Sequence, residues 1–456
     1  MGIAWLGLMC SACGKSDTTA NVSDDADAGG TGVAAGGTAG VAGGVSAPAA
    51  SGTAGVAGVA ESGNVAGEAG AAGSVVCPAG YGNCDGDPTN GCETDLTSDA
   101  AHCGACADAC DDTNAEPHCS DGVCAVSCDE DFADCNDSAD DGCETALASD
   151  ADHCGWCGHD CGNATCSLGV CSPEVVATDE GSSSNQSRLV FDGTNFYWLT
   201  QPTMGSCRLL STEQNGTTLQ LHELPLAQCW MDSLAVDATN VYFSTRDQEI
   251  WRVAKAGDVA SVIYTEQDGG YPSLLAVAGG NIFFAVAATG TLKRITTAGT
   301  GLEQVSIPGI DSLVLFNDLV YFSNIDQVAS VDTALANQTM LMAINVNDVS
   351  THIAVDESDV YRITTGGDGP LCYAVPPNNG FCVNSGESVA TGLALASDAV
   401  YFTGFSGNVY RSERPPPGGD MPVLSDGGPC SAPGGPVLVE DHVYWVCGGS
   451  LLRTPR

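Results

Sequence analysis

The chain has 456 residues and a formal net charge of −44, from 13 Lys and Arg against 57 Asp and Glu. No Lys or Arg occurs between Ser16 and Ser187, so the negative field excludes nucleic acid as a partner. The 24 cysteines indicate an oxidising compartment rather than the cytoplasm.

Residues 1–13 are predicted to be a lipoprotein signal peptide. Met1–Met9 is apolar and too short to span a bilayer, as in the hydrophobic part of a secretory signal. Ser11–Gly14 is similar to a bacterial lipobox, which implies that Cys13 is acylated. Cys10 stands where leucine is usual, and no Lys or Arg precedes the apolar run, so a different start codon or a cut at Cys10 stays open. We expect an outer-membrane lipoprotein of the bacterial cell envelope that faces the periplasm or the surface.

Residues 14–76 are predicted to form a disordered, Gly/Ala-rich tether. Pieces such as Gly40–Gly43 recur without the alternation of a strand or the stripe of a helix. A Gly-rich chain of this length has an end-to-end distance of about 45 Å. The tether can therefore lift folded domains away from a membrane.

Residues 77–127 and 128–172 are predicted to form two small disulfide-rich modules, called module 1 and module 2. Their first six cysteines match position for position at an offset of 51. With so many cysteines and little aliphatic core, each module is expected to hold four disulfides, although eight cysteines allow 105 pairings. The cysteines are Cys77, Cys84, Cys92, Cys103, Cys106, Cys110, Cys119 and Cys124 in module 1, and Cys128, Cys135, Cys143, Cys154, Cys157, Cys161, Cys166 and Cys171 in module 2.

Two other chemistries compete for these modules. Cys103–Cys106 and Cys154–Cys157 have the CxxC spacing of zinc knuckles and thioredoxin-type redox sites. Disulfides are favoured, because sixteen thiols exceed the needs of one zinc site and no βαβ pattern surrounds either pair.

Calcium is the one cofactor that the sequence suggests, because acidic loops between cysteines suit a hard cation. Gly91 falls at the seventh place from Asp85, not at the sixth as in an EF-hand, so Asp/Asn/Gly turns between disulfides are the favoured alternative. The candidate calcium ligands are Asp85, Asp87, Glu93, Asp137, Asp140 and Glu144.

Residues 173–456 are predicted to form an all-β, seven-bladed β-propeller. An apolar run, a polar turn and an apolar-aromatic triplet recur seven times, 38 to 45 residues apart, which is the period of a four-stranded blade. Blades must stack to cover their apolar faces, so the array must close. Two stacked sandwiches are the alternative, but they need no fixed period. The repeat anchors are Tyr197, Tyr242, Phe283, Tyr321, Tyr361, Tyr401 and Tyr444.

The closure of the ring is also predicted. The seventh repeat ends near Thr454, after three strands. Val175–Thr178 resembles the strand Val262–Thr265 and is expected to supply the missing fourth strand. A ring closed in this way removes strand edges that would template aggregation.

Six further cysteines lie in the propeller and are expected to be structural. Each disulfide would contribute about 2 to 4 kcal/mol by restricting the unfolded chain. The expected pairs, with other pairings open, are Cys207–Cys229, Cys372–Cys382 and Cys430–Cys447.

Several of these motifs occur together in one family. The lipobox, the tether, the Val-Tyr-Phe repeats and the motif Asn90–Thr94 with Asp99–Cys106 resemble a group of myxobacterial-type secreted lipoproteins with Cys-rich repeats and a C-terminal β-propeller. The second copy departs modestly, with Asp141–Thr145 and with Trp156 in place of Ala105. The resemblance covers nearly the whole chain. It implies architecture and location, and it supplies no catalytic residues.

The candidate binding residues lie where each repeat enters its innermost strand, at the mouth of the propeller channel. The set is polar and mixed in charge, which suits a sugar or a peptide. His352 with Asp311 or Asp232 would be the acid/base group, although a solvated histidine at a strand end is the commoner case. The candidates are Arg188, Asp232, Ser233, Ser273, Asp311, Ser312, Thr351, His352 and Thr391.

The predicted function is binding of an extracellular or periplasmic ligand, which could be a glycan, a peptide or a protein, at the channel mouth. No GxSxG, HExxH, P-loop or GxGxxG in a strand-turn-helix context is present. The alternative is a lyase or hydrolase. A polar, metal-bearing mouth centred on His352 would favour the enzyme, whereas a wide mouth lined by Trp230 and Tyr271 would favour binding.

Overall fold

The computed structural model describes residues 75–179, 188–200, 206–224, 231–257, 260–324, 326–343, 349–357, 359–365, 371–374, 381–383, 390–414, 416, 422–426 and 433–456. The predicted signal peptide with Cys13, and the tether up to residue 74, lie outside this set. Every regular element among these residues is a β-strand. The described part of the chain therefore contains no helix that is long and apolar enough to cross a membrane.

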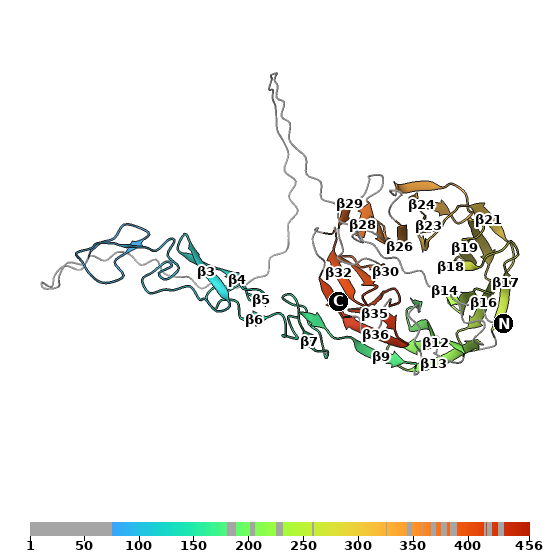
Figure 1. Ribbon diagram of the computed structural model, residues 1–456, viewed down its shortest axis with the longest axis horizontal. Helices are drawn as coiled ribbons and strands as arrows, with labels where there is room; N and C mark the ends of the chain where they lie inside the picture. Colours follow the sequence, from blue (N-terminus) through green and yellow to red (C-terminus); the bar gives the residue numbers. More distant parts are fainter. Residues whose placement is uncertain are drawn as a thin grey trace, which may run out of the picture. The chain divides into compact units, whose positions relative to one another are not determined.

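The predicted seven-bladed propeller is confirmed, and its antiparallel sheets are arranged in a ring (Figure 1). Blade 1 consists of β10 (Leu189–Phe191), β11 (Asn195–Thr200), β12 (Cys207–Glu213) and β13 (Thr218–Leu224). Blade 2 consists of β14 (Met231–Val236), β15 (Asn240–Thr245), β16 (Glu249–Ala254) and β17 (Ser261–Thr265). Blade 3 consists of β18 (Pro272–Ala278), β19 (Asn281–Val286), β20 (Thr291–Thr296) and β21 (Glu303–Ser306). Blade 4 consists of β22 (Ser312–Phe316), β23 (Leu319–Ser323), β24 (Gln327–Asp332) and β25 (Thr339–Ala343).

The remaining three blades follow the same order of strands. Blade 5 consists of β26 (Val349–Val355), β27 (Val360–Thr365), β28 (Leu371–Ala374) and β29 (Phe381–Val383). Blade 6 consists of β30 (Ala390–Leu395), β31 (Ala399–Gly404), β32 (Val409–Glu413) and β33 (Val423–Ser425). Blade 7 consists of β34 (Val437–Val439), β35 (His442–Cys447), β36 (Ser450–Pro455) and β9 (Glu174–Thr178).

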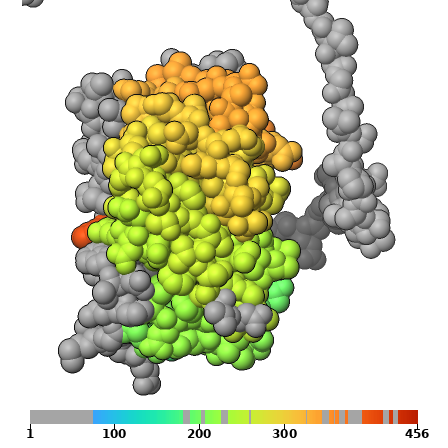
Figure 2. Space-filling model, turned by 90° about the vertical axis from the view of Figure 1, so that its right-hand side faces the viewer, coloured from blue at the N-terminus to red at the C-terminus, as the bar shows by residue number. Residues whose placement is uncertain are grey.

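Each blade buries both faces against its neighbours. The second strand of every blade carries the repeat anchor, and successive residues of that strand face opposite sides of the sheet. In blade 3, Phe283 packs with the core of blade 4, and Phe284 packs with Tyr242 of blade 2. Burying an aromatic side chain contributes about 2 to 3 kcal/mol. The neighbouring blades form a continuous surface that runs from green to orange in Figure 2.

The predicted closing strand is also confirmed. Strand β9 pairs antiparallel with β36, with Leu451 opposite Ala177 and Ser450 opposite Thr178. An ion pair of 2.8 Å between Arg453 Nε and Glu174 Oε2 joins the same two strands. The last blade is therefore built from both ends of the ring sequence.

The Cys-rich region, all of which is described, has the predicted disulfide framework. Both modules use one pairing: first with third, second with fifth, fourth with seventh and sixth with eighth cysteine. The disulfides are Cys77–Cys92, Cys84–Cys106, Cys103–Cys119 and Cys110–Cys124 in module 1, and Cys128–Cys143, Cys135–Cys157, Cys154–Cys166 and Cys161–Cys171 in module 2. The short strands of this region are β1 (Tyr81–Gly82), β2 (Thr94–Asp95), β3 (Ala115–Ser120), β4 (Val123–Cys128), β5 (Phe132–Ala133), β6 (Thr145–Ala146), β7 (Cys166–Ser167) and β8 (Val170–Cys171).

One glycine contact explains part of the module fold. Gly104 has a φ of 78°, and a Cβ there would lie 2.7 Å from the carbonyl oxygen of Gly122. Gly155 of module 2 repeats this close approach at the carbonyl oxygen of Gly169, at 2.5 Å. Only glycine allows the two backbone segments of each module to come so close.

Three ring cysteines, Cys207, Cys372 and Cys447, are in disulfides. Cys372 lies directly opposite Cys382 in the β28–β29 ladder, which is the backbone arrangement expected for that predicted pair. Cys229 and Cys430 lie outside the described residues, so the other two predicted pairs stay predictions.

Module 2 packs against the ring. Strand β8 lies parallel to β33 at the edge of blade 6, with Cys171 opposite Ser425. Trp156 packs against the apolar core of blades 6 and 7 and stacks on His159, with ring centroids 3.9 Å apart. His159 is buried, and this burial lowers its pKa. Module 1 has Ala105 at the place of Trp156, so this docking contact is particular to module 2.

We predict that deleting residues 172–179 will lower the melting temperature of the ring by at least about 10 °C and will cause aggregation. The deletion removes β9 and leaves the β36 backbone unpaired at an exposed edge. Differential scanning calorimetry with light scattering measures both effects. Deleting residues 20–70 is the control and should leave melting unchanged. Equal melting of the strand-deleted and intact chains would contradict the closure.

Replacing Trp156 with Ala, the residue found in module 1, should destabilise the docked module by about 2 kcal/mol, because an apolar contact with the ring is lost. For a ring of this size, that corresponds to a melting temperature about 3 °C lower. Leu168→Ala is the control, because Leu168 is 88% exposed at the tip of the β7–β8 hairpin. Indistinguishable melting curves for the two variants would show that Trp156 does not hold the module.

Candidate binding site at the channel mouth

The first strand of each blade is the innermost one, and these seven strands surround the axis of the ring. All nine predicted mouth residues lie at the beginning of these strands, at one end of the channel. Arg188 and Asp311 directly precede β10 and β22. The others lie within the first four residues of their strands, and they are Asp232 and Ser233 in β14, Ser273 in β18, Ser312 in β22, Thr351 and His352 in β26, and Thr391 in β30. The side chains of Asp232 and Thr351 are outside the described set.

Two of the predicted serines join neighbouring blades. Ser233 Oγ accepts a hydrogen bond of 2.7 Å from the backbone N–H of Leu275 in blade 3. Ser312 Oγ accepts one of 3.1 Å from the N–H of Ile353 in blade 5. Both serines are only 6% exposed. Their hydroxyls therefore satisfy backbone groups of the next blade.

The remaining hydroxyls are used within their own blades. Ser273 donates a hydrogen bond of 3.3 Å to the carbonyl oxygen of Ala285, and Thr391 donates one of 2.9 Å to Thr403 Oγ1. Such bonds hold the inner strand against the second strand. The charged residues of the mouth are therefore the main candidates for contacts with a ligand.

Asp311 is a carboxyl group of the mouth whose acidity is strongly perturbed. Its Oδ1 accepts a hydrogen bond from Ser323 Oγ, whereas its buried Oδ2 has no hydrogen-bond partner among the described residues. Burial raises the pKa of Asp311 to about 6, against the opposing effects of the Ser323 hydrogen bond and the positive charge of Arg362. A carboxyl group that titrates near neutral pH in a polar mouth is typical of functional sites.

The positive charge of Arg188 acts on His352. Burial, and then the positive charge of Arg188, lower the pKa of His352 to about 3. Arg188 begins blade 1 and His352 lies in blade 5, so this interaction joins blades that are not neighbours. The imidazole is neutral at physiological pH. No hydrogen bond joins His352 to Asp311 in the described part of the chain, and the side chain of Asp232, the other acid considered from the sequence, is outside it.

Arg362 is a site residue that the sequence analysis missed. It follows the anchor Tyr361 in β27 and is 3% exposed. It lies opposite Ile353 in the β26–β27 ladder, on the face that packs against blade 4, and its charge acts on Asp311. The signal was present in the sequence, because the equivalent residue in each of the other blades is aromatic and fully buried. These residues are Trp198, Phe243, Phe284, Phe322, Phe402 and Trp445.

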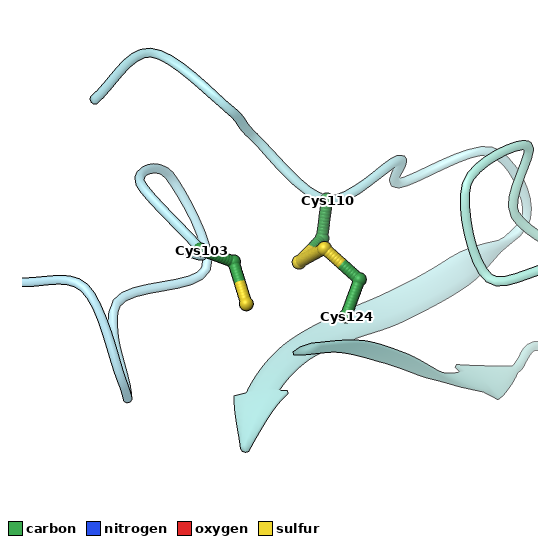
Figure 3. Close-up of side chains that lie close together, drawn as sticks. All are labelled: Cys103, Cys110 and Cys124. Carbon is green, nitrogen blue, oxygen red and sulfur yellow. A yellow bond between two sulfur atoms is a disulfide. The ribbon is translucent and has the colours of Figure 1, made fainter. Parts of the chain in front are cut away.

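The CxxC cysteines of the modules are held in separate disulfides. Cys103 is bonded to Cys119, whereas Cys106 is bonded to Cys84. Figure 3 shows Cys103 beside the Cys110–Cys124 disulfide, with the three sulfur atoms within 4.8 Å of one another. Zinc is bound by thiolates, and sulfur atoms in disulfides are not thiolates. The proximity therefore reflects two adjacent disulfides.

The carboxylates considered for calcium mainly serve their own loops. Asp87 Oδ1 accepts hydrogen bonds from the N–H and hydroxyl of Thr89, at 2.8 and 2.7 Å, which lower the pKa of Asp87. Asp85 accepts from the Asp87 N–H, and Glu93 accepts from the Cys84 N–H, both at 2.8 Å.

In module 2 the corresponding carboxylates show a similar local role. Asp137 has a φ of 60°, as in a turn, and Glu144 accepts a hydrogen bond of 3.2 Å from Thr145. Among the described residues of either module, no three carboxylate groups have oxygen atoms within 4.8 Å of one another. This statement also covers Asp140. Calcium binding stays a prediction.

Known structures resemble this chain at low identity, and no family model or curated protein sequence matches it. Virginiamycin B lyase from Staphylococcus aureus is 11% identical with a TM-score of 0.49, over 59% of this chain and 95% of that one. YCF48 bound to D1 peptide is 13% identical with a TM-score of 0.49, over 62% and 95%. YCF48 from Cyanidioschyzon merolae is 12% identical with a TM-score of 0.49, over 62% and 99%. At this level of similarity, the ligand and activity of this chain have to be inferred from its own residues.

We predict that Asp311→Asn will stabilise the protein at pH 8 but not at pH 4. Folding raises the pKa of Asp311 from 3.8 to about 6. The contribution of Asp311 to the free energy of unfolding is therefore fully present below pH 4 and is lost as the pH rises through 6. The shift corresponds to at most about 3 kcal/mol. Asparagine keeps the acceptor for Ser323. Thermal melts of both proteins from pH 4 to 8 measure the difference, and a difference that does not change with pH would contradict the raised pKa.

Proposed function

We propose that this protein is a lipid-anchored protein of the cell envelope whose propeller binds an extracellular or periplasmic ligand at the channel mouth. The observation that carries the proposal is two charge interactions at the mouth, of Arg188 with His352 and of Arg362 with Asp311, contributed by blades 1, 4 and 5. Charged groups in such a place recognise polar ligands. Glycans, peptides and proteins are the candidate ligand classes.

Binding is favoured over the alternative, a lyase or hydrolase at the same mouth. A general base works best with a pKa near the operating pH, whereas His352 has a pKa of about 3. His352 also has no hydrogen bond to Asp311 in the described part of the chain. Both observations support a role in shaping and charging the mouth.

The proposed location rests on the sequence. The lipobox-like Ser11–Gly14 segment supports acylation of Cys13 and attachment to a membrane through the lipid. The resemblance to myxobacterial-type secreted lipoproteins supports the same placement. Eight disulfides in the modules suit an oxidising environment, and the net charge of −44 disfavours nucleic acid.

A glycan and peptide array probed with the full chain tests the binding proposal. A saturable ligand should bind the wild type, and Arg188→Leu should weaken this binding at least tenfold, because the mouth loses a charge. Arg456→Leu is the control, because it makes the same charge change at the exposed C-terminus. Equal weakening by both variants would contradict a binding site at the mouth, whereas turnover of the ligand by the wild type would favour the lyase or hydrolase alternative over binding.

Cys13→Ala should release the protein from the membrane fraction, because this sulfur is the expected site of acylation. Fractionation with mass spectrometry of the mature N-terminus measures the result. Cys10→Ala is the matched control and should leave the protein in the membrane fraction. A soluble, unmodified wild-type chain would contradict the lipid anchor.

A further inference from the structure

We propose that the Cys135–Cys157 disulfide of module 2 is a reactive site that exchanges with small thiols lacking a negative group, and that His153 stabilises the sulfur that leaves. This inference goes beyond the proposed function, because it concerns module 2 and not the channel mouth. It rests on the exposure of this disulfide, on the imidazole beside it and on the charge of the modules.

The Cys135–Cys157 disulfide is open to solvent on one side. Cys157 is exposed and Cys135 is half-buried. Five of the eight disulfides in the modules contain at least one buried cysteine, and of the other three only Cys135–Cys157 and Cys84–Cys106 have an exposed one. Exchange requires a thiolate to reach one sulfur of the disulfide. A thiolate from solution can therefore attack at Cys157.

An imidazole lies beside both sulfur atoms of this disulfide. A ring nitrogen of His153 and the sulfur atoms of Cys135 and Cys157 lie within 4.8 Å of one another. His153 Nδ1 accepts a hydrogen bond of 3.0 Å from the backbone N–H of Gly158, which orients the ring and leaves the proton of the neutral imidazole on Nε2. An imidazole N–H next to a newly formed thiolate stabilises it, and a more stable leaving thiolate departs faster.

Module 1 provides an internal comparison. Its equivalent disulfide, Cys84–Cys106, also joins a half-buried to an exposed cysteine. His102 occupies the place of His153, and its Nδ1 accepts a hydrogen bond of 2.9 Å from the Ala107 N–H. Among the described residues, however, Cys84, His102 and Cys106 do not come within 4.8 Å of one another. The two copies therefore match in exposure and differ in whether the imidazole reaches both sulfur atoms.

The exchange consists of two balanced steps. A thiolate attacks Cys157 Sγ, forms a mixed disulfide with it and displaces Cys135 as a thiolate beside the His153 N–H. The Cys135 thiolate takes up from solvent the proton that the attacking thiol released. A second thiolate attacks the small-molecule sulfur of the mixed disulfide, which releases the disulfide of the small thiol and leaves Cys157 reduced. Two thiols thus supply the two electrons that reduce the protein disulfide.

The charge of the modules selects the thiol. No Lys or Arg occurs between Ser16 and Ser187, and Asp134 and Asp152 lie next to the site in sequence. The thiolate form of a thiol with a further negative group brings two negative charges into this field, whereas that of an aminothiol has no net charge. Cysteamine and 2-mercaptoethanesulfonate are matched probes, because they share a two-carbon body and differ in the charged group.

A time course of thiol exchange on the full chain tests the proposal. The protein is treated with cysteamine, free thiols are alkylated, and peptide mass spectrometry follows each disulfide. Cys135–Cys157 should open at least tenfold faster than Cys84–Cys106, with cysteamine attached to Cys157 and the alkyl group on Cys135. At equal thiolate concentration and low salt, 2-mercaptoethanesulfonate should react at least tenfold more slowly than cysteamine, and high salt should reduce this difference.

Substitution of the histidine tests its role. His153→Asn keeps a side-chain acceptor for the Gly158 N–H and removes the second ring nitrogen. It should slow the opening of Cys135–Cys157 at least fivefold and leave the opening of Cys84–Cys106 unchanged. His102→Asn is the matched control in module 1 and should change neither rate.

Each other outcome has a defined meaning. Equal opening of the two disulfides, or attachment of cysteamine to Cys135 in place of Cys157, would overturn the reactive site. An unchanged rate in folded His153→Asn would overturn the role of the imidazole. Equal rates for the two probes at low salt would overturn the selection by charge. If His153→Asn does not fold, the comparison of the two disulfides in the wild type decides.

Discussion

The antiparallel pairing of β9 with β36 is the constraint on which the rest of the ring depends. It joins residues more than 270 positions apart, such as Thr178 and Ser450, and completes the last blade. Without it, blade 7 would lack its fourth strand, and the apolar core between blades 7 and 1 would lose Val176 and Ala177. The closure therefore fixes the position of Arg188, which begins blade 1. Because Cys171 in β8 lies only a few residues before β9, the docking of module 2 on blade 6 also holds the closing strand in place.

Within the closed ring, two kinds of polar residue occupy the mouth. Hydroxyl groups such as those of Ser233 and Ser312 bind backbone N–H groups of the next blade, so they maintain the repeat. Charged groups break the repeat, because Arg362 stands at an aromatic position and Asp311 titrates near pH 6. The features that the blades share thus stabilise the ring, and we propose that ligand recognition depends on the residues at which blades 1, 4 and 5 differ from the other blades.

The sequence predicts the fold well, because the period of about forty residues and the cysteine repeat are local patterns. Even the closing strand could be identified, because the seventh repeat has only three of the four strands that a blade needs. The disulfide pairing could not be predicted from the sequence, because it depends on which segments meet in space. Cys103 and Cys106 are only three residues apart but have different partners. The roles of Ser233 and Ser312 depend on contacts between blades, which sequence position alone does not provide. Arg362 directly follows the anchor Tyr361, and the anchor pattern alone does not distinguish it. Comparing the residue after each anchor would have found it.

The central claim is that ring closure places His352 of blade 5 and Arg188 of blade 1 together in the channel. An NMR titration of histidine-labelled protein, with the His352 signal assigned from a His352→Gln variant, tests this directly. The account predicts an imidazole that stays neutral down to pH 4.5, in keeping with a pKa of about 3. A His352 that titrates near the ordinary value of about 6.5 would contradict the burial of this side chain beside Arg188.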